Sequence, residues 1–140
     1  MDSPRLRFIL TGQYAPGGRG ELCPVRRVPL YNCWGLVMAL TALFGCPVPE
    51  YDEPATPRGV HRAFDQRATL PGWNRLDGPV PGCVIGLRTH PRYTELVCHF
   101  GVVLDACRFA HIQRDAGLHV SRFDQPPYRN MLAGFYAWNA

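Results

Sequence analysis

The sequence predicts an α+β fold in which one helix packs on an antiparallel sheet of five to six strands. Apolar residues between Cys33 and Phe44 recur with the spacing of a helix that buries one face. Strand-like stretches then follow one another at short intervals from Val84 to Trp138. One helix followed by a run of closely spaced strands is typical of an antiparallel meander that the helix covers on one face.

A chain of 140 residues has the length of one domain with its own hydrophobic core. We therefore expect a single domain over residues 1–140, made of an N-terminal arm at 1–29 and a core at 30–138. Apolar residues alternate with other residues between Leu6 and Leu10, which hints at a short strand or an extended arm at the start of the chain.

The helix predicted from Cys33 to Phe44 is the most clearly marked element. Asn32 is suited to cap its N-terminus, and Gly45 followed by Pro47 is a typical helix end. Cys33 therefore falls in the first turn, where free backbone N–H groups and the positive end of the helix dipole favour a thiolate. A cysteine has an ordinary pKa of about 8.5, and a helix N-terminus is one of the environments that lower it. This placement suits a nucleophile, although a small core residue is the alternative interpretation, because free cysteines are often buried.

Five prolines between Gly45 and Asp77 exclude long regular structure there, apart from a short helix at about His61 to Ala68. A turn at Pro81 and Gly82 then leads into the first strand. Strands are expected at 84–87, 97–104, 108–113, 118–123 and 134–138.

A pair of histidines supports the catalytic interpretation of Cys33. His99 begins one strand and His111 lies on the next, twelve positions later, so an antiparallel pair of strands can bring the two rings side by side. A cysteine peptidase needs a histidine that takes the thiol proton and a third polar group that orients this histidine. We expect Cys33 to be the nucleophile, His99 the base and His111 the orienting residue. His90 and His119 have no place in this triad and are expected on the surface, whereas His61 lies in a position to rim the site.

The charge pattern gives no sign of a nucleic-acid or membrane partner. The net charge is +4, and all fifteen basic side chains are Arg, scattered among acidic residues with only Arg26 and Arg27 adjacent. A nucleic-acid or membrane surface usually appears as a clustered basic run. A weak attraction to an anionic polymer such as a cell wall remains compatible with this balance.

Six cysteines invite two further interpretations. They contain no C-x-x-C pair, and a chain of this length does not need disulfides for stability, so we expect free thiols. A zinc site is the alternative, because Cys98, His99, Cys107 and His111 lie close in sequence, but their spacings are not those of a structural zinc motif. We expect no metal and no cofactor.

Several short motifs together resemble a known family. A Cys-Trp-Gly-Leu-Val helix start, a Phe-Gly helix end with a following Pro-acidic-Tyr segment, a Pro-Gly strand entry, a His-x-Gly strand, a second His and an aromatic last strand are found at 33–37, 44–51, 81–82, 99–103, 111 and 132–138. In this combination the chain, over residues 30–138, is similar to the NlpC-type cysteine peptidases of bacterial cell walls. It most resembles the small peptidases encoded among phage tail-assembly proteins. Two positions differ, because Asn32 and Cys83 stand where the family commonly has Asp.

The resemblance implies a papain-like NlpC-type core with the nucleophile helix at its N-terminal end. It implies hydrolysis of peptide bonds in peptidoglycan stem peptides, next to D-glutamate or diaminopimelate, without a metal or a cofactor. The Cys33 backbone N–H is then expected to hold the oxyanion. Tyr31 and Trp34 are candidates for lining the substrate groove, although residues of this kind more often belong to the core.

The expected partners and location follow from the same resemblance. A peptidoglycan peptide is the expected substrate, and phage-tail or secretion-machine proteins are open as partners. The N-terminus lacks an apolar signal core, so we expect synthesis in the cytoplasm without a signal peptide, and delivery to the periplasm or cell wall in a virion or tail-like particle. No apolar run is long enough for membrane insertion. Two alternatives stay open: a tail or scaffold protein that has lost catalysis, and an acyl or amide transferase that uses the same triad.

Overall fold

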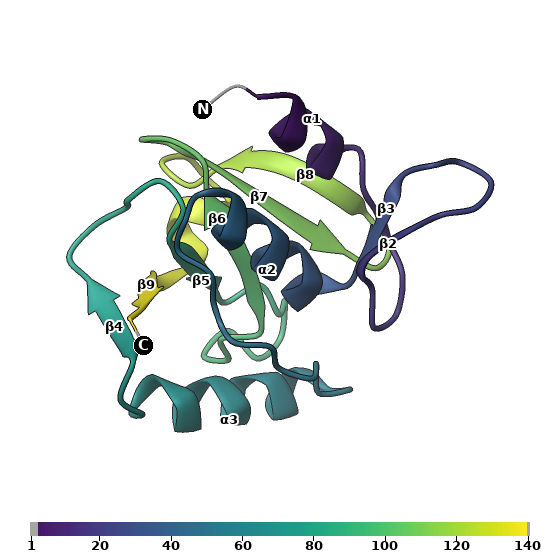
Figure 1. Ribbon diagram of the computed structural model, residues 1–140. Coiled ribbons are helices and arrows are strands. Elements are labelled where there is room, and N and C mark those ends of the chain that lie inside the picture. The colour runs from purple at the N-terminus through teal and green to yellow at the C-terminus, as the bar shows by residue number, and fades with distance from the viewer. Residues whose placement is uncertain (1–2, 140) are drawn as a thin grey trace.

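An antiparallel six-stranded sheet forms the centre of the computed structural model, which describes residues 3–139 (Figure 1). Its strand order is β4-β9-β5-β6-β7-β8, and every neighbouring pair is antiparallel. The strands are β4 (Trp73–Leu76), β5 (Val84–Leu87), β6 (His99–Val103), β7 (Arg108–Gln113), β8 (Gly117–Arg122) and β9 (Leu132–Trp138). The predicted α+β class and the five strands from β5 to β9 are confirmed.

Strand β4 was not predicted, because it lies in the proline-rich region that we expected to be irregular. Its pairing partner is the C-terminal strand β9, where Trp73 lies opposite Trp138 and Leu76 opposite Phe135. These four residues show no clear alternation of apolar and polar side chains, so the local sequence does not predict a strand. The distant strand β9 therefore determines their conformation.

Helix α2 (Cys33–Leu43) begins and ends as the sequence predicts. The Asn32 side chain accepts a hydrogen bond from the Gly35 N–H at 2.8 Å, and Gly45 adopts a φ of +82° just after the helix. One face of α2 places Leu36, Val37 and Leu40 in the main core. There they join Val84, Val102, Ala110 and Ile112 from the sheet. The helix is therefore held against the middle of the sheet at the strands that carry the two histidines.

The other face of the sheet has a second core. Ile85, Leu87, Val103 and Phe109 are fully buried there and pack with Phe123. Residues 123–131, which end in a short 3₁₀ helix η1 (Tyr128–Met131), contribute Tyr128 and Met131 to this cluster. The strands of the centre are thus covered on both sides, which explains their nearly continuous apolar sequence.

The start of the chain corrects one prediction. Pro4–Leu10 is a helix, α1, and not a strand or an extended arm. The Ser3 side chain accepts a hydrogen bond from the Leu6 N–H, and Pro4 occupies the first helical position, where its missing N–H is harmless. Leu6 is buried against the main core, so the helix docks on α2.

A small second sheet follows α1. It contains β1 (Gln13–Tyr14), β2 (Arg19–Leu22) and β3 (Pro29–Tyr31) in the order β1-β3-β2. Strand β3 leads directly into α2, and β2 contacts the same helix. In Figure 1 this sheet lies to the right of α2, beside the end at which the helix begins. This small sheet thus supports the start of α2.

Residues 46–70, which we call the cover segment, differ from the rest of the fold. They contain α3 (Pro57–Ala68), which begins four residues before the predicted His61 because Thr56 caps it and Pro57 occupies its first position. No residue of the cover segment is buried. Figure 1 shows α3 set apart from α1 and α2, near the start of β4. None of the helices within residues 3–139 is both long enough and apolar enough to span a membrane.

Candidate active site

The two predicted histidines form a hydrogen-bonded chain with a serine. His99 Nε2 lies 2.7 Å from His111 Nδ1, and His111 Nε2 lies 2.8 Å from Ser121 Oγ. The three residues come from the neighbouring strands β6, β7 and β8, where His111 lies opposite Gly101 and Phe109 lies opposite Ser121. Strand register therefore brings the histidines together, as their spacing predicts.

Gly101 leaves room for this arrangement. A Cβ atom at Gly101 would lie 3.2 Å from the His111 Cβ and 2.9 Å from the Phe109 ring. The Phe109 and Tyr128 rings pack against the His111 ring, with centroids 4.5 and 5.2 Å away. A Cβ atom at Gly101 would also lie only 2.5 Å from the Ala110 carbonyl oxygen, so close packing against β7 explains this glycine.

Both rings are neutral at ordinary pH. Burial lowers the pKa of His99 to about 4 and that of His111 to about 3, and in His111 the neighbouring His99 and His119 add to the effect. Each neutral imidazole carries one N–H, and one of these N–H groups forms the hydrogen bond between the two rings. We assign this proton to His99 Nε2, so that His111 Nε2 donates to Ser121 and His99 Nδ1 is free to accept a proton.

Cys33 lies at the start of α2 with 9% of its surface exposed. Its thiol donates to the Phe100 carbonyl at 3.5 Å, and this is its only hydrogen bond within residues 3–139. Burial, followed by the charge of Glu53, raises the pKa of the Cys33 thiol to about 12. The expected lowering of this pKa by the helix N-terminus is therefore wrong for this arrangement: loss of hydration outweighs the helix dipole, and the sulfur is protonated.

A cavity of about 590 Å³ is shared by Cys33 and His99, and we call it the histidine cavity. It is lined by Asn32, Thr89 and Cys98 as well, and by the charged side chains of Arg19, Asp52, Glu53 and Arg114. The nucleophile and the base predicted from the sequence thus face one space that is large enough for a peptide.

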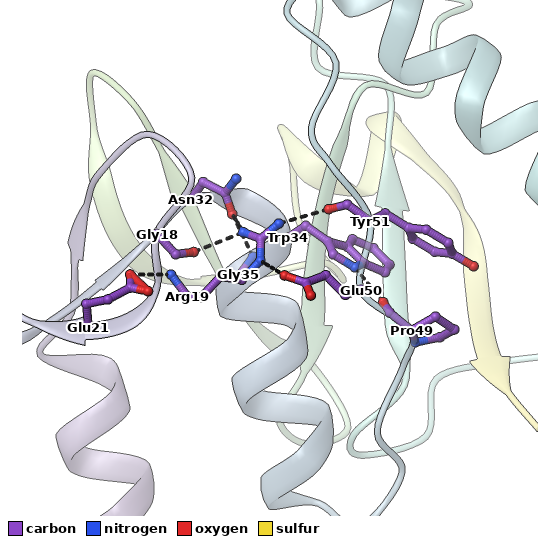
Figure 2. Close-up of polar contacts among 9 residues, drawn as sticks. All are labelled: Gly18, Arg19, Glu21, Asn32, Trp34, Gly35, Pro49, Glu50 and Tyr51. Atoms are coloured by element: carbon purple, nitrogen blue, oxygen red, sulfur yellow. Dashed lines mark hydrogen bonds and ion pairs between the residues drawn. The ribbon is translucent and has the colours of Figure 1, made fainter.

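Arg19 connects the start of α2 to the cover segment (Figure 2). Its Nη1 donates to Asn32 Oδ1 at 2.5 Å, while Nε donates to Glu50 at 2.9 Å and Nη2 to the Tyr51 carbonyl at 2.9 Å. Beside it, Trp34 Nε1 donates to the Pro49 carbonyl at 2.9 Å. One planar guanidinium thereby fixes the capping residue Asn32, next to Cys33, and the irregular stretch at Glu50 and Tyr51.

The two predicted groove residues have different positions. Trp34 lines a second cavity next to Cys33 and contacts the Tyr51, Trp73 and Phe100 rings. Tyr31 is 3% exposed, belongs to the main core and lines neither cavity. The structure therefore places Tyr31 with the core residues and not with a substrate groove.

The remaining histidines lie outside the triad. His119 is exposed, and His90 Nδ1 accepts hydrogen bonds from the Arg92 and Tyr93 N–H groups. His61 lines neither cavity; its Nδ1 accepts from the Val97 N–H at 2.9 Å and so ties α3 to the segment just before β6.

The six cysteines are all free thiols, as predicted. Cys107, which the zinc alternative would need, lies in the turn between β6 and β7 and contacts Asp105. Within residues 3–139, no group of three or more His, Cys, Asp or Glu side chains is arranged to hold a metal ion.

Arg19, Ser121 and Glu53 are site residues that sequence reasoning did not identify. Arg19 begins the short strand β2 between two glycines, and Ser121 is one polar residue on an alternating strand, so neither has a local pattern that marks it. Only the strand register and the course of the cover segment bring them to the site.

Comparisons with known proteins agree with this geometry at the level of the fold. No family model and no curated protein sequence matches the chain. Among solved structures it is similar to NlpC1 of Trichomonas vaginalis (TM-score 0.57, 17% identity, 98% of this chain and 46% of that chain). It is also similar to NlpC2 of the same organism (0.59, 13%, 100% and 49%). A third match is a Staphylococcus aureus protein described as similar to lipoprotein, of the NLP/P60 family (0.58, 15%, 96% and 40%).

The chain thus spans less than half the length of each of these three proteins. At such identities the likeness concerns the backbone arrangement, and the phage-tail subtype stays a prediction. The helix start, the sheet order and the three matches agree, and the chain has the NlpC/P60-type, papain-like fold.

Proposed function

We propose that this protein is a cysteine peptidase or amidase that hydrolyses peptide bonds in peptidoglycan stem peptides. The observation that carries the proposal is the hydrogen-bonded His99–His111 pair, of which His99 lines the same cavity as Cys33. A thiol at a helix start, a neutral buried base and an orienting group are the parts that acyl transfer by cysteine requires. The NlpC/P60-type fold supports cell-wall peptides as the substrate class.

The first chemical step begins from two neutral groups. The Cys33 thiol leaves the Phe100 carbonyl and turns toward His99, which takes its proton on Nδ1 while the sulfur attacks the amide carbonyl carbon. The new imidazolium is stabilised because His99 Nε2 donates to His111 Nδ1, and His111 in turn donates to Ser121. The Cys33 backbone N–H, free in the first turn of α2, is directed at the developing oxyanion.

The second half returns the protein to its starting state. His99 gives its proton to the leaving amine as the C–N bond breaks, which leaves a thioester on Cys33. Water, deprotonated by His99, then attacks the thioester carbonyl, and the carboxylic acid product and the thiol are released. An amine or alcohol in place of water would make the protein a transferase, which is the alternative use of the same groups.

The test is cleavage of purified peptidoglycan, followed by mass spectrometry of the released fragments and assay of new free amines. Wild-type protein should release new fragments, and Cys33→Ser should lose on the order of a thousandfold or more of the rate, because serine is far less acidic. Cys23→Ser, on a loop away from both cavities, is the matched control and should keep full activity.

The pH dependence adds a second readout. His99 must be neutral to accept the thiol proton, so cleavage should fall as the pH drops through about 4. No fragments at any pH, from a protein that is folded by circular dichroism, would favour the alternative of a catalytically silent tail or scaffold protein. A role within a phage tail or secretion machine rests on the sequence motifs alone and would be sought by co-purification with such particles.

A further inference from the structure

A second cavity borders Cys33 and lies against α3. It has a volume of about 70 Å³. Its wall is mostly apolar and includes Trp34, Val60, Ala63, Phe64, Phe100 and Tyr136. We call it the aromatic cavity.

The rings around this cavity hold one another in place. The Phe64 ring lies 5.7 Å from Phe100 and 5.3 Å from Tyr136, and the Trp34 ring lies 5.9 Å from Phe100, centroid to centroid. Such contacts resist collapse of the space between the rings. The aromatic cavity is thus built by side chains from α2, α3, β6 and β9.

Helix α3 directs its apolar residues at this space. Val60, Ala63 and Phe64 have the i, i+3, i+4 spacing of one helix face, and all three line the cavity. No residue of α3 is fully buried. The inner face of α3, where Phe64 packs on Phe100 and Tyr136, is therefore only partly covered, and an apolar group in the cavity would bury more of it.

The nucleophile connects the two cavities. Cys33, Asp52, Glu53 and Cys98 line both the aromatic cavity and the histidine cavity. A substrate whose carbonyl reaches Cys33 would therefore lie where the histidine cavity and the aromatic cavity meet.

We propose, resting on the function proposed above, that the aromatic cavity is a subsite for a short, uncharged aliphatic group of the substrate next to the bond that Cys33 attacks. Size supports this choice, because an engineered apolar cavity of about 150 Å³ accommodates benzene and this one has about half that volume. A branched or linear alkyl group of about two to four carbons fits, and an aromatic ring does not.

Charge supports the same choice. Asp52 and Glu53 lie where the two cavities meet and would repel a carboxylate that entered the aromatic cavity. The Arg67 guanidinium is stacked on the Tyr51 ring, 3.8 Å from its centroid, and so is already engaged at the cavity wall. Among residues 3–139, an acidic group of the substrate would find no free cationic side chain in the aromatic cavity, whereas an alkyl group would contact the aromatic rings.

The test uses small thiol reagents, so that it does not depend on peptidoglycan. Alkyl methanethiosulfonates transfer their S-alkyl group to a cysteine thiolate, form a disulfide and release methanesulfinate. Methyl, ethyl, propyl, butyl, benzyl and 2-carboxyethyl reagents are applied to the whole protein under pseudo-first-order conditions. Peptide mapping by mass spectrometry gives the rate at Cys33, divided by the rate at Cys23 to remove intrinsic reactivity.

The relative rate at Cys33 should rise about fourfold for each added methylene from methyl to propyl, as each buries further apolar surface. It should fall for the benzyl and 2-carboxyethyl reagents. Ala63→Leu fills the cavity and should abolish the dependence on chain length, whereas Gln66→Leu, on the exposed face of the same helix, should leave it unchanged. Thermal unfolding of both variants verifies that they are folded.

Two results would overturn the proposal. One is a chain-length profile at Cys33 that runs parallel to that at Cys23, and the other is an unchanged profile in a folded Ala63→Leu protein. The proposed hydrolase activity can fail independently: a length-selective Cys33 in a protein that does not cleave peptidoglycan would refute that activity and keep the subsite.

Discussion

The sheet strands and the cover segment meet at Cys33, but they are built in opposite ways. Strands β5 to β7 carry fully buried residues on both faces, and the hydrogen-bonded His99, His111 and Ser121 lie on β6, β7 and β8. The cover segment has no buried residue, and single interactions such as the Arg19 contacts and the His61 bond to the Val97 N–H tie it down.

The difference separates two tasks. Proton transfer needs groups held within a few tenths of an ångström, and a doubly covered sheet provides this. A substrate must enter and leave, and a lightly packed segment opens at a smaller free-energy cost than a core strand. We therefore expect changes in the sheet to affect the chemical step, and changes in the cover segment to affect which substrate is accepted.

The largest effect should come from the histidine pair. His99→Ala should reduce cleavage about as much as Cys33→Ser, because His99 handles the proton that moves, and general acid–base catalysis contributes about 10²- to 10⁴-fold. His111→Ala should be milder, and His111→Asn should retain more activity than His111→Ala, because an amide oxygen can still accept from the imidazole. Steady-state rates on peptidoglycan fragments measure the order.

The comparison of the two regions would be broken if His99→Ala kept its activity while a surface change on α3, such as Gln66→Ala, removed it. If His111→Ala were as inactive as His99→Ala, with no rescue by Asn, then His111 would take part in proton transfer directly and not through His99.

An intermediate effect is expected where the two regions are joined. Arg19→Ala removes the bonds to Asn32, Glu50 and the Tyr51 carbonyl, and should lower the free energy of unfolding by about 2 kcal/mol. Hydrogen exchange should increase in the cover segment far more than in β6 and β7. Arg26→Ala, on an exposed loop, is the control and should change neither. Equal loss of protection in β6 would show that the two regions open as one unit.

The smallest effect should come from the far end of the hydrogen-bonded chain. Ser121→Ala leaves His111 Nε2 without its partner at 2.8 Å, and we expect up to about a tenfold decrease in kcat with KM unchanged. Nitrogen-15 chemical shifts should show a mixed tautomer in place of the single form that we assign to His99 and His111. Ser121→Thr keeps a hydroxyl and should restore both readouts. Unchanged shifts in Ser121→Ala would show that the serine does not fix the tautomer.

Much of the fold could be predicted from local patterns. The cap at Asn32, the apolar period up to Leu43 and the glycine after the helix each depend on neighbours in the chain, so α2 was predicted to within a residue. Alternation on short strands placed His99 and His111 on one face for the same reason. The first helix was missed because Leu6, Phe8 and Leu10 also fit a strand, and the choice depends on Leu6 packing on the distant core.

The sequence by itself determined helix α2, with Cys33 in its first turn, and the strands that carry His99 and His111, because each follows from the conformational preferences of adjacent residues. Tertiary structure alone decided the protonation state of Cys33, the Arg19 contacts, the serine behind His111 and the aromatic cavity. Each of these depends on which side chains from remote parts of the chain surround one atom or one space. Burial and partner geometry are set only when those parts come together, and no local pattern of residues encodes them.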